Sequence, residues 1–128
     1  MIFVDTNYFL RFLLKDISHE HEKAKQLFLD GAEGKVKLFT SLLVVFEIYW
    51  VLSSFYEKEK VEIIKTLREI LDLDFIRIDD KLLMKETLEI YQRTTLDLED
   101  SFNLVYAHSK KAKEFKTFDK KLAKQFRR

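Results

Sequence analysis

Four acidic residues lie where a carboxylate could do more than face solvent. Glu47 is the only charged residue in the apolar stretch 42–52. An ionised carboxylate in such surroundings is costly unless it is paired, hydrogen-bonded or bound to a metal ion. The other three are Asp5, which follows an apolar N-terminal run, Asp100 and Asp119. Clustered carboxylate oxygens are hard ligands that suit Mg²⁺ or Mn²⁺, so the four acids are candidate ligands of a divalent cation.

Each acid also has an ordinary structural interpretation. Asp5 and Asp119 could cap helices, and Asp100 could interact favourably with a helix dipole. For any one of these three taken alone, we favour the ordinary interpretation. Glu47 in the middle of a helix would cap nothing, although it could form a buried ion pair with Arg11 or a lysine. The conjunction of four acids is what favours a shared cation site.

The acids can share a site only if the fold brings them together. Apolar runs predict short strands at four places, namely 1–5, 36–40, 74–78 and 115–118. Capping residues and helical spacing predict the intervening helices, namely one capped by Thr6 or Asn7 that runs to about Leu14, 19–30, a Ser41-capped helix carrying Glu47, 58–71, one capped by Asp79 or Asp80 that runs to about Arg93, one with Asp100 in its first turn that reaches about Ala112, and one from Asp119 onward. This alternation predicts one α/β domain over residues 1–128, with a central parallel sheet of four or five strands and helices on both faces.

The predicted topology places the acids at one edge of that sheet. Carboxyl ends of parallel strands meet at a common edge, where ligands of such sheets bind. Asp5 and Asp119 each follow a predicted strand, and Glu47 lies about two turns into the helix after the second strand. Asp100 begins the helix that leads to the fourth strand. We therefore expect all four acids to lie within reach of one another.

Composition excludes several other kinds of chemistry. The chain has no Cys, which excludes disulfides, cysteine-ligated zinc and thiol nucleophiles. The apolar run around Glu47 is about half of the ~20 residues that a membrane span needs. The N-terminus lacks the basic segment and small-residue cleavage site of a signal peptide. We expect a cytoplasmic protein with no membrane association.

Charge is distributed unevenly along the chain. The formal net charge is only +1, but residues 101–128 carry nine Lys and Arg against two acids, Glu114 and Asp119. A basic segment beside an acidic site suggests an anionic substrate. On this feature alone, a solvated Lys-rich face is the simpler interpretation.

The four acids lie in short motifs that occur in a characteristic order. The motifs are Val4-Asp5-Thr6-Asn7, Glu47 within Ser41-Leu-Leu-Val-Val-Phe-Glu-Ile48, Leu98-Glu99-Asp100-Ser101-Phe102, and Lys116-Thr117-Phe118-Asp119-Lys120. In this order and at these spacings, the chain resembles a PIN-domain protein over essentially its whole length. Its length resembles the small VapC-type toxins of toxin–antitoxin pairs.

The resemblance implies a Mg²⁺- or Mn²⁺-dependent endoribonuclease that hydrolyses RNA with a metal-activated water. By matching motif, the catalytic and metal-site acids would be Asp5, Glu47, Asp100 and Asp119, with Asp5 and Asp100 as direct ligands. Secondary candidates are Thr6, Asn7, Asp97, Asn103 and Thr117, although for Asp97 we favour a role as a loop cap. The resemblance also implies a cognate antitoxin protein and a homodimer as partners.

Two departures and two alternatives accompany this resemblance. Family members often end with a further strand, whereas this chain ends at Arg128, and Phe102 and Asn103 stand where small or aliphatic residues are usual.

One alternative is a PIN-like module that has lost catalysis and holds RNA or a protein. The other is a haloacid dehalogenase-like phosphatase, but that class has Asp-x-Asp after its first strand, and here the second position is Asn7.

Overall fold

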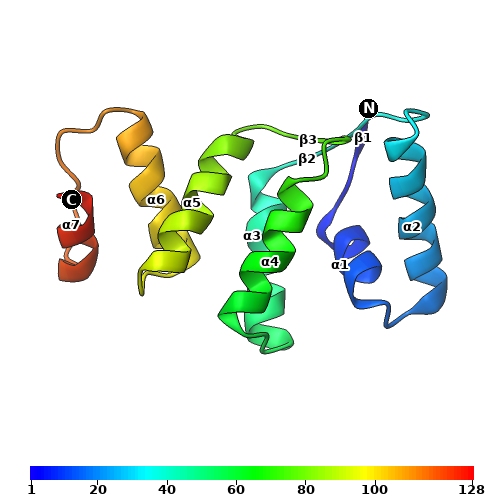
Figure 1. Cartoon of the computed structure of the whole chain (residues 1–128), viewed down its shortest axis with the longest axis horizontal. Coiled ribbons are helices and arrows are strands. Elements are labelled where there is room, and N and C mark those ends of the chain that lie inside the picture. Colours follow the sequence, from blue (N-terminus) through cyan, green and yellow to red (C-terminus); the bar gives the residue numbers. More distant parts are fainter. The chain divides into compact units, whose positions relative to one another are not determined.

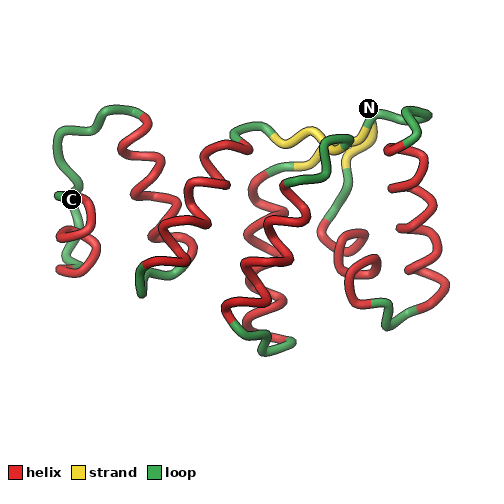
Figure 2. Tube along the Cα trace, in the orientation of Figure 1, coloured by secondary structure: helices red, strands yellow, loops and turns green.

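The computed structural model describes all of residues 1–128. The chain forms two compact units, unit 1 over Met1–Asp79 and unit 2 over Asp80–Arg128. Unit 1 contains a parallel sheet of three strands, and unit 2 contains only helices and loops, as Figure 2 shows. With seven α-helices in total, the fold belongs to the α/β class that the sequence predicts.

Three short strands form the sheet of unit 1. These are β1 (Ile2–Phe3), β2 (Leu38–Thr40) and β3 (Ile76–Ile78), hydrogen-bonded in the order β1-β2-β3. Both pairings are parallel, as expected, and Leu38 of the central strand lies opposite Ile2 on one side and Ile76 on the other. The carboxyl ends of the strands therefore lie at one edge of the sheet.

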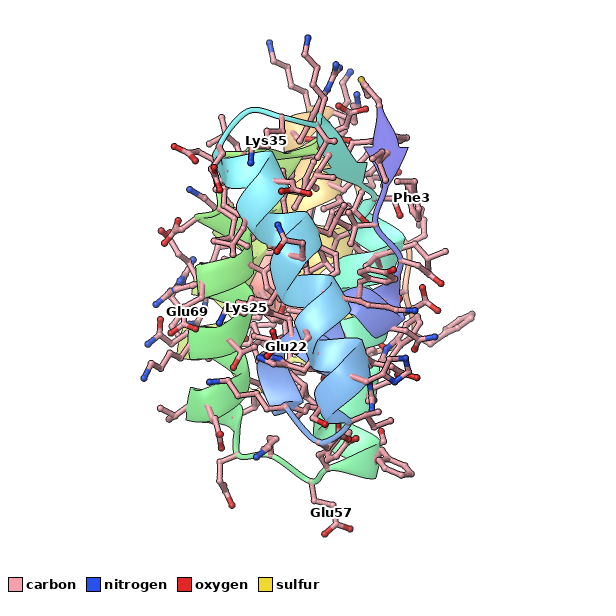
Figure 3. All side chains as sticks on the ribbon, turned by 90° about the vertical axis from the view of Figure 1, so that its right-hand side faces the viewer. Phe3, Glu22, Lys25, Lys35, Glu57 and Glu69 are labelled. Carbon is pink, nitrogen blue, oxygen red and sulfur yellow. The ribbon has the colours of Figure 1, made fainter.

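Four α-helices complete unit 1, and their bounds are α1 (Thr6–Leu14), α2 (Ser18–Ala32), α3 (Leu42–Trp50) and α4 (Lys60–Leu71). A π-helical turn, η1 (Val51–Phe55), continues α3 directly. Helix α1 packs against α2 and α3, and α3 packs against α4 (Figure 1). In Figure 3, α2 is nearest the viewer and carries Glu22 and Lys25, which are both exposed. The buried side chains of this unit include Phe9, Ile48 and Leu67.

Local sequence signals account for where these helices begin and end. Helix α3 starts as predicted after Ser41, whose hydroxyl accepts the backbone N–H of Val44 at 3.4 Å. Helix α2 continues through Gly31 to Ala32, and a Cβ at Gly31 would lie 2.6 Å from the Leu38 side chain, so glycine favours the close approach of α2 to β2 there. The chain then turns at Gly34, whose φ of +79° lies in the left-handed region.

Unit 2 consists of α5 (Lys81–Arg93), α6 (Leu98–Ser109) and α7 (Lys120–Phe126). Helices α5 and α6 lie side by side, and α7 packs against α6. An apolar cluster holds this unit together, and its members are Leu96, Leu104, Leu122, Ile90, Phe115 and Phe126. No helix of either unit has the length and apolarity required to cross a lipid bilayer.

The fourth strand predicted at 115–118 is not formed. This segment is irregular and belongs to unit 2. The ring of Phe115 packs on that of Phe126, with centroids 5.3 Å apart, and the Thr117 hydroxyl accepts the backbone N–H of Asp119 at 3.0 Å. Such local contacts compete with strand pairing for the same groups. The sheet of four or five strands is therefore corrected to three.

Candidate functional site

Asp5 lies just beyond the carboxyl end of β1, at the position preceding α1. The backbone before it is held by β2, because the Val4 N–H donates to the Phe39 carbonyl at 2.9 Å and the Thr40 hydroxyl donates to the Val4 carbonyl at 2.7 Å. The Asp5 side chain is exposed and makes no capping hydrogen bond. Its carboxylate thus projects from a fixed point of the backbone and is not committed to helix α1.

Glu47 lies on α3 and is half-buried. The hydroxyl of Thr6, a residue that is only 8% exposed, donates to Glu47 Oε1 at 3.0 Å. The alternative ion pair with Arg11 is not formed, since the Arg11 guanidinium instead contacts Asp16 at 2.8 Å. Of the residues predicted for the site, Thr6 and Glu47 are therefore in direct contact across 41 positions of sequence.

Two predicted site residues of unit 2, Asp97 and Asp119, cap helices, and a third, Thr117, supports the Asp119 cap. Asp97 caps α6 by accepting the backbone N–H of Asp100 at 2.8 Å. Asp119 caps α7 by accepting the N–H of Leu122 at 3.0 Å. Thr117 in turn fixes the backbone of Asp119 through its hydroxyl. Capping uses one oxygen of each carboxylate, so it does not exclude a second role.

Asp100 lies in the first turn of α6 and has unfavourable electrostatic surroundings. Desolvation by burial is the largest cause that raises the pKa of its carboxyl group above the ordinary value. The negative charges of Asp97, Asp119 and Glu99 raise the pKa further, in that order, and Lys121 partly opposes them. A divalent cation at this position would relieve the repulsion.

The two asparagines of the predicted site are exposed. Asn7 lies on α1 next to Thr6, and Asn103 lies on α6 one helical turn after Asp100. Sequence reasoning did not single out Thr40, which anchors the backbone before Asp5, or Lys121, the cation that acts on Asp100. Thr40 ends a predicted strand, and that position is a signal that could have identified it.

The four predicted acids can be compared with the ligands that a divalent metal ion requires. Within neither unit are three or more His, Asp or Glu side chains gathered closely enough to form a metal site. Asp5 and Glu47 belong to unit 1, and Asp100 and Asp119 belong to unit 2. All four donors are carboxylates, and Mg²⁺ is commonly held by one or two carboxylates while it keeps several waters. The residue types therefore fit a hard divalent cation.

Comparison with known proteins adds one finding. A protein-family model described as the PIN domain matches residues 2–126, which is nearly the whole chain. The chain has no significant match among curated proteins or among solved structures.

Proposed function

The chain belongs to the PIN-domain family, and from that premise we propose that it is a Mg²⁺- or Mn²⁺-dependent endoribonuclease. PIN domains are in general nucleases that use divalent metal ions. The observation that carries the proposal is the environment of Asp100, whose pKa is raised by burial and by Asp97, Asp119 and Glu99. Perturbed carboxyl groups of this kind are typical of functional sites.

In this proposal Asp5 and Asp100 are direct metal ligands, and Glu47 and Asp119 bind the metal or orient its waters. The contacts within each unit support these roles. Thr6 holds Glu47 in one orientation through their 3.0 Å hydrogen bond. The capping bond from Leu122 fixes one oxygen of Asp119. We also propose that residues 1–128 function as a single PIN-like domain.

A bound cation would supply a nucleophilic water at neutral pH and positive charge opposite the reacting phosphate. Because water rather than the ribose 2′-hydroxyl attacks, the products would carry 5′-phosphate and 3′-hydroxyl ends. The exposed lysines that follow α6 are suited to contact the RNA backbone as point charges, and these are Lys110, Lys111, Lys113 and Lys116. Backbone contacts of this kind position the strand without selecting its sequence.

We further propose that the protein is the toxin of a VapBC-type pair and acts in the cytoplasm, where its RNA substrate would be. The order and spacing of the four motifs support this assignment. An antitoxin would block the site by placing a basic side chain against the acids. Leu43 and Trp50, seven positions apart on α3, are both exposed and offer an apolar face that a second copy would cover in a homodimer.

The test is cleavage of single-stranded RNA by the purified chain with Mg²⁺, with Mn²⁺ and with chelator. We expect cleavage only with metal, and a loss of about 100-fold or more in Asp5→Asn, since removal of groups that merely support a metal ligand already costs about 10- to 100-fold. Asp74→Asn, a change at an exposed acid outside the site, is the matched control. Full cleavage by folded Asp5→Asn would reject the assignment.

The alternative is a PIN-like module that has lost catalysis and holds RNA or a partner protein. The observation that favours it is that neither unit by itself gathers three metal-binding side chains. A metal titration separates the two functions. A nuclease should gain about 2.7 kcal/mol of stability at a metal concentration 100 times its Kd, and an inactive module that binds no metal should gain nothing.

A further inference from the structure

A pocket of about 260 Å³ lies between α1 and α2 of unit 1. Its lining residues are Asn7, Tyr8, Arg11, His19, Glu20 and Lys23. Pockets for drug-sized ligands are usually about 300–1,000 Å³, so this one suits a smaller group such as a single heterocycle. None of its residues belongs to the set of acids proposed to bind metal.

The charges of the pocket are nearly balanced. The Arg11 guanidinium contacts Asp16 at 2.8 Å and Glu20 at 4.0 Å, so its charge is compensated within the unit. Lys23 and Glu20 carry opposite charges, and the remaining lining groups are polar. The pocket is therefore poorly suited to a phosphate, which needs uncompensated cations, and better suited to a neutral ligand that forms hydrogen bonds.

The side chains of the pocket match the chemistry of a nucleobase. Tyr8 is 40% exposed and lines the pocket with an aromatic ring, on which any base can stack. Asn7 can both donate and accept hydrogen bonds, His19 can do either, and the Glu20 carboxylate accepts. Bases of single-stranded RNA are recognised in this way, by stacking on an aromatic ring and hydrogen bonding along their edges.

The pocket lies next to Thr6 and Asp5 along the chain. Asn7 lines it and directly follows Thr6, whose hydroxyl contacts Glu47, and Asp5 lies one residue before Thr6. We propose that this pocket binds one base of the RNA strand beside the cleaved phosphate and thereby sets the base preference of the enzyme. The inference rests on the proposed function, because it takes RNA as the substrate. A protein segment is the less favoured occupant, since the pocket has one aromatic ring and no aliphatic wall to hold an apolar anchor.

The experiment measures RNA binding without chemistry. Wild-type protein is mixed with a pool of short, randomised single-stranded RNA in chelator, and the bound fraction is sequenced. We expect one base to be enriched at one position. Tyr8→Ala should reduce that enrichment by about five-fold or more, which corresponds to losing the weakest base–aromatic stack. Glu20→Gln should change which base is enriched, because an acceptor is replaced by a group that also donates.

Two variants serve as controls for this experiment. Tyr8→Phe keeps the ring and should retain the enrichment. Phe55→Ala removes another exposed ring of unit 1, which is 78% exposed and does not line the pocket, and should also retain it. A merely structural role of Tyr8 would lower total binding without altering the preference at a single position.

The outcomes separate the pocket from the nuclease. Absence of any enriched base in the wild type, or enrichment that Tyr8→Ala and Glu20→Gln leave unchanged, overturns the inference. If Tyr8→Ala and Glu20→Gln leave RNA selection unchanged but weaken binding of an antitoxin, the pocket binds a protein partner. That result also overturns the inference. Failure of the nuclease proposal shows separately, as absence of metal-dependent cleavage, since the binding assay needs no turnover.

Discussion

The acidic residues of the two units have different surroundings. In unit 1, Glu47 accepts a hydrogen bond from the nearly buried Thr6, and Asp5 is exposed on a backbone held by Thr40. In unit 2, the charges of Asp97, Asp119 and Glu99 together with burial raise the pKa of Asp100. Unit 1 orients Glu47 through a neutral donor, and unit 2 places like charges around Asp100.

The difference suggests how the work is divided. Thr6 orients Glu47 within unit 1, and neighbouring acids raise the pKa of Asp100 within unit 2. Hydrogen bonds from neutral groups orient a carboxylate without neutralising its charge, so they leave it able to bind a cation. Crowded carboxylates are stabilised when a divalent cation replaces their mutual repulsion with attraction.

The largest effect should come from truncating the cores, which tests whether the two units unfold together. Leu67 in unit 1 and Leu104 in unit 2 are both buried. We expect Leu67→Ala and Leu104→Ala each to lower the free energy of unfolding by about 2–5 kcal/mol. Denaturant titration followed by circular dichroism should show one shared transition if residues 1–128 form one domain. Two transitions, each sensitive to one variant, would contradict this, and Leu82→Ala at an exposed position is the control.

The next largest effect, on RNA cleavage, should come from substituting Asp100. Asp100→Asn removes the carboxylate at which the repulsion of unit 2 is concentrated. We expect RNA cleavage with Mn²⁺ to fall about 100-fold or more, since the group is a proposed direct ligand. The shift of melting temperature on adding Mn²⁺ should shrink in parallel. An Asp100→Asn protein that cleaves normally would reject Asp100 as a metal ligand.

A smaller effect should follow from removing the hydrogen bond between Thr6 and Glu47. Thr6→Val preserves the side-chain shape but removes the hydroxyl that donates to Glu47. Loss of a hydrogen bond to a charged group should lower the free energy of unfolding by about 1.5–3 kcal/mol. Cleavage should also fall, because Glu47 loses its fixed orientation. Thr6→Ser keeps the hydroxyl and should restore most of the activity, and equal defects in both variants would refute the positioning role.

The smallest effect concerns the pH dependence of stability in metal-free protein. Because the folded-state pKa of Asp100 is raised, the folded chain binds more protons than the unfolded chain between the ordinary and the raised pKa, so stability falls as pH rises through this interval. Asp100→Asn should therefore raise the melting temperature at neutral pH in chelator. The gain should disappear as pH falls below the ordinary pKa of Asp.

Attraction to the α6 dipole favours the Asp100 carboxylate by about 0.3–1 kcal/mol, which keeps the net gain modest. Asp74→Asn is the control for this measurement as well. An unchanged or lower melting temperature for Asp100→Asn at neutral pH would show that unit 2 tolerates its acids without a cation. The contrast between the units would then not hold.

Much of the secondary structure is predictable because its signals are local. Ser41 marks the start of α3, Asp97 the start of α6 and Asp119 the start of α7, since each side chain accepts an N–H three residues ahead. The three strands of unit 1 lie within their predicted ranges for the same reason, as short apolar runs between helices. The start of α1 differs by one or two residues, because Asp5 rather than Thr6 or Asn7 precedes it.

The error at 115–118 has a different origin. Two aromatic residues within four positions are typical of a strand, but a strand also needs a partner with free backbone groups. Here Phe115 packs into the apolar cluster of unit 2, and Thr117 forms its hydrogen bond with Asp119. Pattern alone does not distinguish a paired strand from an irregular apolar segment.

The sequence by itself determined the residue types of the candidate site, their order along the chain and most helix boundaries, because composition and capping depend on neighbours within a few positions. The tertiary structure decided which partner each acid has. Thr6 rather than Arg11 contacts Glu47 across 41 positions, and Asp119 acts on Asp100 from another helix. Contacts of such long range depend on how helices pack, and no local pattern of residues encodes the distance between two side chains.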